Sequence, residues 1–240
     1  MNKLGVKKSN ASDLEKKLLS LADKKRALIT ARFFKTEPGD YAAHDIFLGI
    51  TVPQLRKIAI NFLDLSYSDL QKFLNSKYHE FRFIALLILL SKFKRASARE
   101  REKIFKFYLK NLKNINNWDL VDLSSYQIIG AYLFDKDRQL LYDLLASDHL
   151  WTKRVAIVST LYFIKNNDLD DIYKMAKILT ADQPDLIQKA VGWMLREAGK
   201  KDQARLEKFL IANKENLART TWRYAIEKFS PKKKNYFMPL

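Results

Sequence analysis

Hydrophobic residues recur every three or four positions along most of the chain, and no stretch alternates for long between apolar and polar residues. Such spacing is typical of amphipathic helices and not of strands. Helix-start signals agree, because Ser12, Ser66 and Ser97 are each followed three residues later by an acidic residue, as in a capping box. Pro53 and Pro184 stand where first-turn prolines belong. The pattern predicts about a dozen helices joined by short loops.

The helical pattern also repeats. Three segments each read as a turn, a helix start and an alanine inside an apolar helix, and their alanines are Ala85, Ala156 and Ala190. These alanines lie 71 and then 34 residues apart, which is two repeats and then one repeat of about 35 residues. Paired helices with such a period indicate an α-solenoid. We therefore expect an all-α fold, a solenoid of HEAT-like helix pairs with a concave basic cleft.

We expect residues 1–240 to form a single domain of this kind, with a basic C-terminal tail from about residue 230. Lys232, Lys233 and Lys234 give that tail its charge, and we expect them to be a solvated end that adds to non-specific attraction.

Charge narrows the choice of partner. The chain has 44 lysines and arginines against 27 acidic residues, a net charge of +17 at pH 7, and such a surplus attracts polyanions. The longest purely apolar run, residues 83–90, is too short to cross a bilayer. Nucleic acid is therefore the preferred partner and a membrane is not expected, although a merely basic soluble protein stays open. The absence of cysteine excludes disulfides and a cysteine nucleophile, and it fits a reducing cytosol.

One predicted helix begins at Asn117 and carries an unusual face. At about 100° per residue, Trp118, Asp122 and Tyr126 project to one side of it. The residues that can pack on a core project to the other side: Leu120, Val121, Ser124 and Ile128. An indole and a carboxylate together on the outward face indicate a contact site.

A second indole, Trp193, lies about 110° from the centre of an apolar stripe on the predicted helix over residues 185–199. Lys189 and Arg196 flank it, and Gly192 is expected to leave space beside it. A tryptophan between two cations suits contact with a nucleotide sugar or base. Packing against the next solenoid layer is the competing interpretation.

Three further arginines are candidate DNA-binding residues: Arg154, Arg219 and Arg223. Lys153, which precedes Arg154, is another candidate. Arg154 lies on an apolar stripe, so it must find an anion or reach solvent. A backbone phosphate would satisfy it, and a buried ion pair with a helix carboxylate is the alternative. Arg219 and Arg223 are i, i+4 partners on the expected final helix, where Thr220 and Thr221 accompany them. That face could bind successive phosphates, and a solvated charged face explains it equally well.

Other chemistries lack their signatures. The chain has no glycine-rich phosphate loop and no Gly-x-Ser-x-Gly. His44, His79 and His149 are scattered without metal-ligand spacing, and the neighbours His44 and Asp45 have no evident third partner. The histidine spacing therefore gives no metal site, and we expect a carboxylate as the reactive group if the chain is an enzyme.

Four motifs occur in a fixed order between about Ala42 and Phe229: Phe47-Leu48-Gly49-Ile50 with Pro53 and Arg56, then Trp118-Asp119-x-Val121-Asp122, then Trp151-x-x-Arg154-x-Ala156-Ile157, then Ile187-Gln188-Lys189-Ala190-Val191-Gly192-Trp193-x-Leu195-Arg196-Glu197. In this order they resemble the AlkD-type family of bacterial DNA alkylation repair glycosylases.

The resemblance implies a helical enzyme that removes N3- and N7-alkylated purines from duplex DNA, leaves an abasic site and needs no metal or cofactor. By position, Asp122 matches the family's catalytic carboxylate, and Trp118 and Trp193 match two tryptophans that touch the lesion's deoxyribose. Arg154 matches a cleft arginine near the DNA backbone. The resemblance further implies that the damaged base stays stacked and is not enclosed in a pocket. Some members have a second tryptophan where this chain has Asn117.

We therefore expect a monofunctional alkylpurine DNA glycosylase, a cytoplasmic, nucleoid-associated monomer whose partner is alkylated duplex DNA. Asp122, Trp118 and Trp193 are its expected catalytic residues. The expected DNA-binding residues are Arg154, Lys153, Lys189, Arg196, Arg219 and Arg223. One alternative is a non-catalytic HEAT-like protein that recognises damaged or bent DNA, which would have no use for Asp122. Another is a scaffold that binds an acidic protein.

Overall fold

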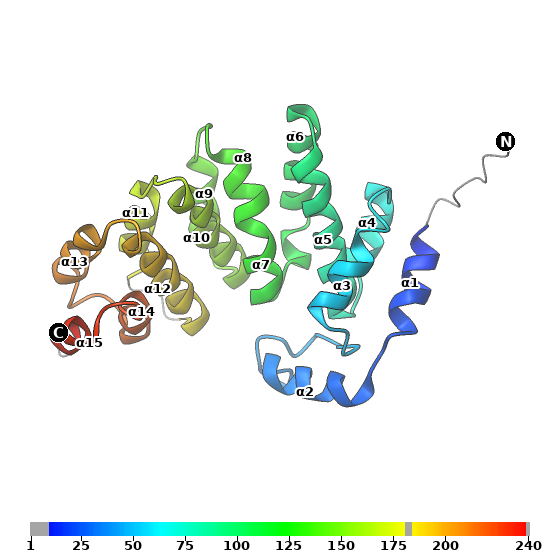
Figure 1. The fold of residues 1–240 in the computed structure, drawn as a ribbon, viewed down its shortest axis with the longest axis horizontal. Helices are drawn as coiled ribbons and strands as arrows, with labels where there is room; N and C mark the ends of the chain where they lie inside the picture. Colours follow the sequence, from blue (N-terminus) through cyan, green and yellow to red (C-terminus); the bar gives the residue numbers. More distant parts are fainter. Residues whose placement is uncertain (1–9, 181–183, 239–240) are drawn as a thin grey trace. The chain divides into compact units, whose positions relative to one another are not determined.

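The computed structural model describes residues 10–180 and 184–238, and in these ranges helices are joined by loops and turns, with one isolated β-bridge between Ile46 and Tyr78 (Figure 1). The all-α prediction is confirmed. Nowhere in these ranges does a helix combine the length and the apolar character that crossing a membrane requires. The chain forms two compact units, residues 1–120 and 121–240, which are described in turn.

The first unit contains six helices and the start of a seventh in its described part. Their bounds are α1 (Ala11–Leu19), α2 (Lys24–Phe34), α3 (Val52–Ala59), α4 (Tyr67–Leu74), α5 (His79–Arg95), α6 (Ala98–Lys110), a 3₁₀ turn at Leu112–Asn114 and the first turn of α7 (Trp118–Ser125). Helix α5 is the centre of this unit, because α3, α4 and α6 all pack against it.

The second unit continues α7 and adds a π-helix and eight α-helices in its described part. Their bounds are a π-helix at Tyr126–Gly130, α8 (Ala131–Leu133), α9 (Gln139–Leu145), α10 (Leu150–Lys165), α11 (Asp170–Ile178), α12 (Asp185–Gly199), α13 (Gln203–Ala212), α14 (Arg219–Ala225) and α15 (Pro231–Phe237). Helix α10 packs on the π-helix, α12 on α10, and α14 on α12, so equivalent helices form a continuous stack.

The repeat predicted from the alanines is present in the helix starts. Helices α5, α7, α10, α12 and α14 begin at residues 79, 118, 150, 185 and 219, and so lie 39, 32, 35 and 34 residues apart. Within the second unit each of these helices buries one side on the helix one period away, which is how a solenoid obtains a continuous core from short repeats.

Local capping agrees with the sequence at two of three predicted sites. The backbone N–H groups of Asp69 and Glu100 donate to the hydroxyls of Ser66 and Ser97, the N-cap residues that precede α4 and α6. The capping box predicted at Ser12 is wrong. The cap of helix α1 is Asn10, two residues earlier, and the Asp13 N–H donates to Oδ1 of Asn10 at 3.0 Å.

The Phe47-Leu48-Gly49-Ile50 motif has a structural role that the sequence did not reveal. A Glu80 carboxylate oxygen accepts the N–H of Gly49 at 2.8 Å, and the other oxygen accepts the N–H of Leu48 at 2.9 Å. Gly49 has a φ of +81°, and a β-carbon there would lie 2.4 Å from the carbonyl oxygen of Asp23. The turn therefore needs glycine for both its backbone angle and its close packing.

The residues expected to form a basic tail instead form α15 and dock on the second unit. Phe237 is buried, and its carbonyl accepts the indole N–H of Trp222 at 2.9 Å. Lys232 and Lys233 stay exposed, and Lys233 pairs with Glu207. The apolar end of the segment explains the docking, since Phe237 also contacts the ring of Phe229.

Gly192 lets α14 approach α12 closely. A β-carbon at Gly192 would lie 2.5 Å from the carbonyl oxygen of Thr221 and 2.5 Å from Cβ of Tyr224, both on α14. The expectation that Gly192 leaves open space beside Trp193 is therefore wrong, because the backbone of α14 occupies that space.

We expect Gly192→Ala to destabilise the protein by about 1–2 kcal/mol, because overpacking outweighs the better helix propensity of alanine. The matched control is Gly199→Ala, whose β-carbon would meet chiefly the flexible end of Leu206. Urea unfolding followed by circular dichroism measures both changes. Equal stability of the two variants would contradict this account of the packing between α12 and α14.

Candidate functional site

The predicted division of α7 into two faces is present in the structure. The residues expected to pack inward are all buried: Leu120, Val121, Ser124 and Ile128. Trp118, Asp122 and Tyr126 are partly exposed. Helix α7 begins in the first unit and continues into the second, so the surroundings of Trp118 and of Asp122 are described separately.

In the first unit, Trp118 lies against the end of α2. Its ring stacks on Phe34, with centroids 5.0 Å apart and planes 11° apart, and meets the edge of Phe33 at 6.0 Å. Phe34 is buried, whereas Phe33 is 67% exposed. One indole face is thus covered by protein. Sequence reasoning missed these aromatic partners, because residues of α2 and α7 are too far apart in the chain for helical spacing to relate them.

In the same unit, the buried side chain of His79 contacts two carboxylates. Nδ1 of His79 lies 3.1 Å from Oδ2 of Asp45, and Nε2 lies 2.8 Å from Oδ2 of Asp119. Asp45 also accepts hydrogen bonds from Arg82 and, at 2.7 Å, from Asn117. Asp45 was expected to lack a third partner. That expectation is wrong, because its partners follow 34, 37 and 72 residues later in the chain.

These contacts shift the pKa values of two groups. Burial alone would raise the pKa of Asp45, but the hydrogen bond from His79 and the charge of Arg82 outweigh it and lower that pKa to about 2. Burial alone would lower the pKa of His79, but the charge and hydrogen bond of Asp119, together with Asp45, raise it to about 9. At neutral pH, His79 is therefore an imidazolium between two carboxylates.

In the second unit, Asp122 pairs with Arg154 on α10. Nε and Nη2 of Arg154 donate to Oδ1 and Oδ2 of Asp122 at 2.9 and 2.8 Å, and Nη1 donates to the carbonyl of Leu186 at 2.5 Å. The structure therefore contains the buried ion pair that was the alternative interpretation of Arg154. Three of the five guanidinium N–H groups are engaged in these bonds.

Trp193 is partly exposed on α12, while its apolar stripe is buried apart from partly buried Leu186: Ile187, Ala190, Val191, Met194, Leu195 and Ala198. Both flanking cations form ion pairs. Lys189 meets Asp185 at 2.6 Å, and Arg196 pairs with Glu197 and Glu227.

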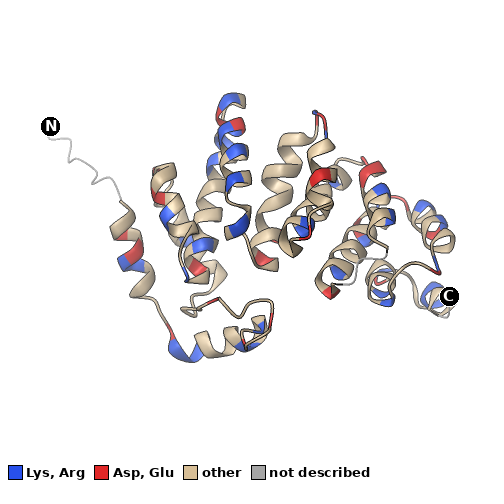
Figure 2. Ribbon diagram, turned by 180° about the vertical axis from the view of Figure 1, so that it is seen from behind, with Lys and Arg blue, Asp and Glu red and all other residues tan. Residues whose placement is uncertain are grey.

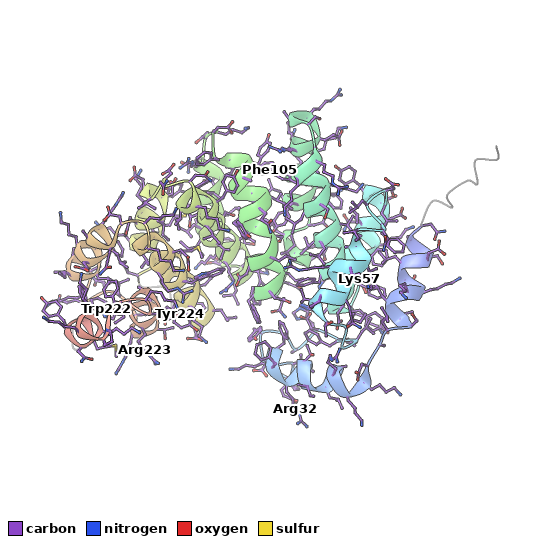
Figure 3. The ribbon with its side chains drawn as sticks, in the orientation of Figure 1. Arg32, Lys57, Phe105, Trp222, Arg223 and Tyr224 are labelled. Atoms are coloured by element: carbon purple, nitrogen blue, oxygen red, sulfur yellow. The ribbon has the colours of Figure 1, made fainter. Side chains whose placement is uncertain are left out.

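The two predicted phosphate-binding arginines on α14 are exposed, and neither forms an ion pair within the described part of the chain. Figure 3 labels Arg223, and Figure 2 shows the basic residues of α14 and α15. The neighbouring Thr221 is buried and donates to the carbonyl of Gln188 at 3.1 Å. Thr221 therefore ties α14 to α12 and does not extend the basic face.

Several of the predicted site residues lie on consecutive stacked helices of the second unit. Asp122, Arg154 and Trp193 lie on α7, α10 and α12, and Lys153, partly exposed, precedes Arg154. The Leu186 carbonyl that binds Arg154 belongs to the same helix as Trp193, seven residues earlier, so both residues lie on the same helix side. Direct bonds thus join Asp122, Arg154 and the start of α12.

Comparisons with known proteins agree with the fold. A sequence model described as "DNA alkylation repair enzyme" matches residues 14–229. A solved structure described as a predicted DNA alkylation repair enzyme from Enterococcus faecalis matches 88% of this chain and 97% of its own, with a TM-score of 0.66 and 18% identity. At this identity the likeness establishes the fold alone. A comparison with curated proteins finds no match.

The raised pKa of His79 predicts a pH-dependent stability. The histidine contributes fully below its unfolded pKa of about 6.5, and this contribution is lost as the pH rises through about 9. The loss amounts to about 3 kcal/mol. We expect urea unfolding of the wild type to show a steeper decline between pH 6 and pH 9.5 than unfolding of His79→Gln, which lacks the titrating group. Parallel declines would contradict the charged state of His79.

Proposed function

We propose that this chain, which belongs to the DNA alkylation repair enzyme family, is a monofunctional glycosylase that removes N3- and N7-alkylated purines from duplex DNA. One observation carries the proposal. In the pair formed by Asp122 and Arg154, the carboxylate is the more exposed member, with 18% of its side chain accessible against 6% for the guanidinium. A chain with a net charge of +17 thus holds an oriented anion where a ligand can reach it.

An anion at this place suits the chemistry of a cationic lesion. An N3- or N7-alkylated purine already carries positive charge, so it leaves without strong acid assistance. As the glycosidic bond breaks, positive charge develops on the deoxyribose, and a fixed carboxylate stabilises it. Asp122 would also orient or deprotonate the attacking water. An indole ring stabilises a cation through its quadrupole, a property that Trp118 and Trp193 each offer on a partly exposed face.

Arg154 acts in this proposal as the residue that positions Asp122. Its two parallel N–H bonds fix the plane of the Asp122 carboxylate. The third bond, to the carbonyl of Leu186, fixes the guanidinium itself. The pre-formed pair therefore removes reorganisation that a free aspartate would undergo during the reaction.

DNA binding is assigned to the exposed cations. Arg219 and Arg223 lie one turn apart on α14 and are not consumed by ion pairs among the described residues, which suits contacts with successive phosphates. Lys153, Lys189 and Arg196 would add to the field around Trp193. The candidate tryptophans and Asp122 lie on partly exposed helix faces, which supports contact with the DNA backbone without enclosure of the base.

A second candidate function rests on the same ion pair. If Asp122 serves only to neutralise buried Arg154, the chain would be a non-catalytic protein that binds damaged or bent DNA. Such a protein would bind alkylated duplex without releasing a base. The two candidate functions therefore differ in whether Asp122 affects the rate of base release or only the stability of the fold.

We expect Asp122→Asn to slow the release of 7-methylguanine from methylated duplex DNA by about 10²–10³-fold, because the fixed negative charge is lost. DNA affinity should hold or improve, since a carboxylate repels phosphates. Single-turnover release and fluorescence anisotropy measure the two quantities.

The matched control is Asp185→Asn, which removes an exposed carboxylate that pairs with Lys189 on α12. It should release base within twofold of the wild-type rate. Thermal unfolding of both variants shows whether they are folded at the assay temperature. Release by folded Asp122→Asn at the wild-type rate would rule out the catalytic role of Asp122.

Replacing Arg219 and Arg223 together by glutamine should weaken duplex binding and make log affinity less steep against log salt by about 1–2, since each phosphate contact contributes about one unit. The control is a double glutamine variant of Lys103 and Lys106 on α6, which pair with Glu100 and Glu102. An unchanged slope in the α14 variant would refute the phosphate contacts. A shallow slope for the wild type would favour a scaffold that binds an acidic protein.

A further inference from the structure

The buried His79 has no part in the chemistry proposed above, yet its geometry determines its charge. Both ring nitrogens face carboxylate oxygens, at 3.1 Å for Asp45 and 2.8 Å for Asp119. An ionised carboxylate only accepts hydrogen bonds, so both nitrogens must carry protons. A neutral imidazole would leave one of the two carboxylates facing a lone pair.

The groups around the ring balance in charge only when His79 is protonated. Asp45 and Asp119 supply two negative charges, and His79 and Arg82 supply two positive charges. Another titratable group in the described part of the chain, His44, lies 3.2 Å from Asp45 and is half exposed. Loss of the proton on His79 would leave an uncompensated negative charge in a buried place, which is costly.

Two contacts connect this ring to Trp118. Asp119, the next residue in α7, has no hydrogen-bond partner for its buried Oδ1 among the described residues, so the bond from His79 to Oδ2 holds its side chain. Phe34 touches both rings, with centroids 5.2 Å from His79 and 5.0 Å from Trp118. Phe47 stacks on His79 at 4.6 Å.

We propose that His79 is a positioning residue whose imidazolium, clamped between Asp45 and Asp119, fixes the first turn of α7 and with it the orientation of Trp118. The consequence for base release rests on the proposed glycosylase function. The clamp itself does not, because it follows from contacts within the first unit. Trp118 is thus oriented by a buried charge and by Phe34, and its exposed side stays available to a nucleotide sugar.

Nuclear magnetic resonance of the wild-type protein labelled with ¹⁵N-histidine tests the clamp without relying on activity. Substitution of His44 and His149 assigns the His79 signals. We expect both His79 nitrogens to be protonated from pH 6 to pH 8. The indole signal of Trp118, assigned with Trp118→Phe, should shift as His79 loses its proton near pH 9. A neutral His79 at pH 7 would overturn the proposal, and so would a Trp118 indole signal that does not shift when His79 loses its proton.

Base release tests the consequence. His79→Gln keeps a donor for one carboxylate only, so we expect single-turnover release at saturating enzyme to fall at least about tenfold while DNA affinity changes less than about threefold. The matched control is Tyr142→Phe, which removes a hydrogen bond to Asp171 in the second unit. It should lower thermal stability with release within twofold of the wild-type rate.

Release by His79→Gln at the control rate would overturn the positioning role. If the wild type itself releases no base, the glycosylase proposal fails, while the protonation state of His79 and its coupling to Trp118 still decide whether the clamp exists. The resonance measurement uses unaltered protein, so it also decides the matter if His79→Gln does not fold.

Discussion

The polar contacts of each unit depend on one constraint, the spacing of the helical repeat. In the first unit 34 residues separate Asp45 from His79 and 40 separate His79 from Asp119, and in the second unit 32 separate Asp122 from Arg154. A further 32 separate Arg154 from Leu186. Stacked helices bring such positions side by side, so Asp122 on α7 meets Arg154 on α10. A shift of register between these two helices would break both bonds between Asp122 and Arg154.

This constraint explains how much could be predicted from the sequence. Helical periodicity predicted which face of α7 is buried, and the spacing of Ala85, Ala156 and Ala190 predicted the repeat length. These two features could be predicted because the contacts that produce them recur regularly along the chain. The partners of individual polar residues could not be predicted. Choosing Asp122 for Arg154, or His79 for Asp45, requires the register between helices, and no local pattern encodes it. The same limit applies to Gly192, where α14 fills a space that the sequence of α12 suggested was open.

Buried and exposed cations serve different purposes in this chain. The buried ones, Arg82, Arg154 and His79, hold carboxylates in fixed orientations. Buried ion pairs contribute little net stability, because desolvation offsets their attraction, but breaking one is costly. Their value here is orientation. In the proposed function, the exposed cations of α14 and α15 would supply the long-range attraction for DNA, which needs no fixed geometry. An anion presented by a buried arginine thus coexists with a strongly basic chain.

The most direct test of the glycosylase account uses unaltered protein and a duplex that carries a single 7-methylguanine. After incubation at neutral pH, mass spectrometry counts the free base, and an aldehyde-reactive probe counts abasic sites. The account predicts equal amounts of both products, formed faster than spontaneous depurination, with the DNA strand uncut. Tight binding of the duplex with release no faster than in buffer would contradict it.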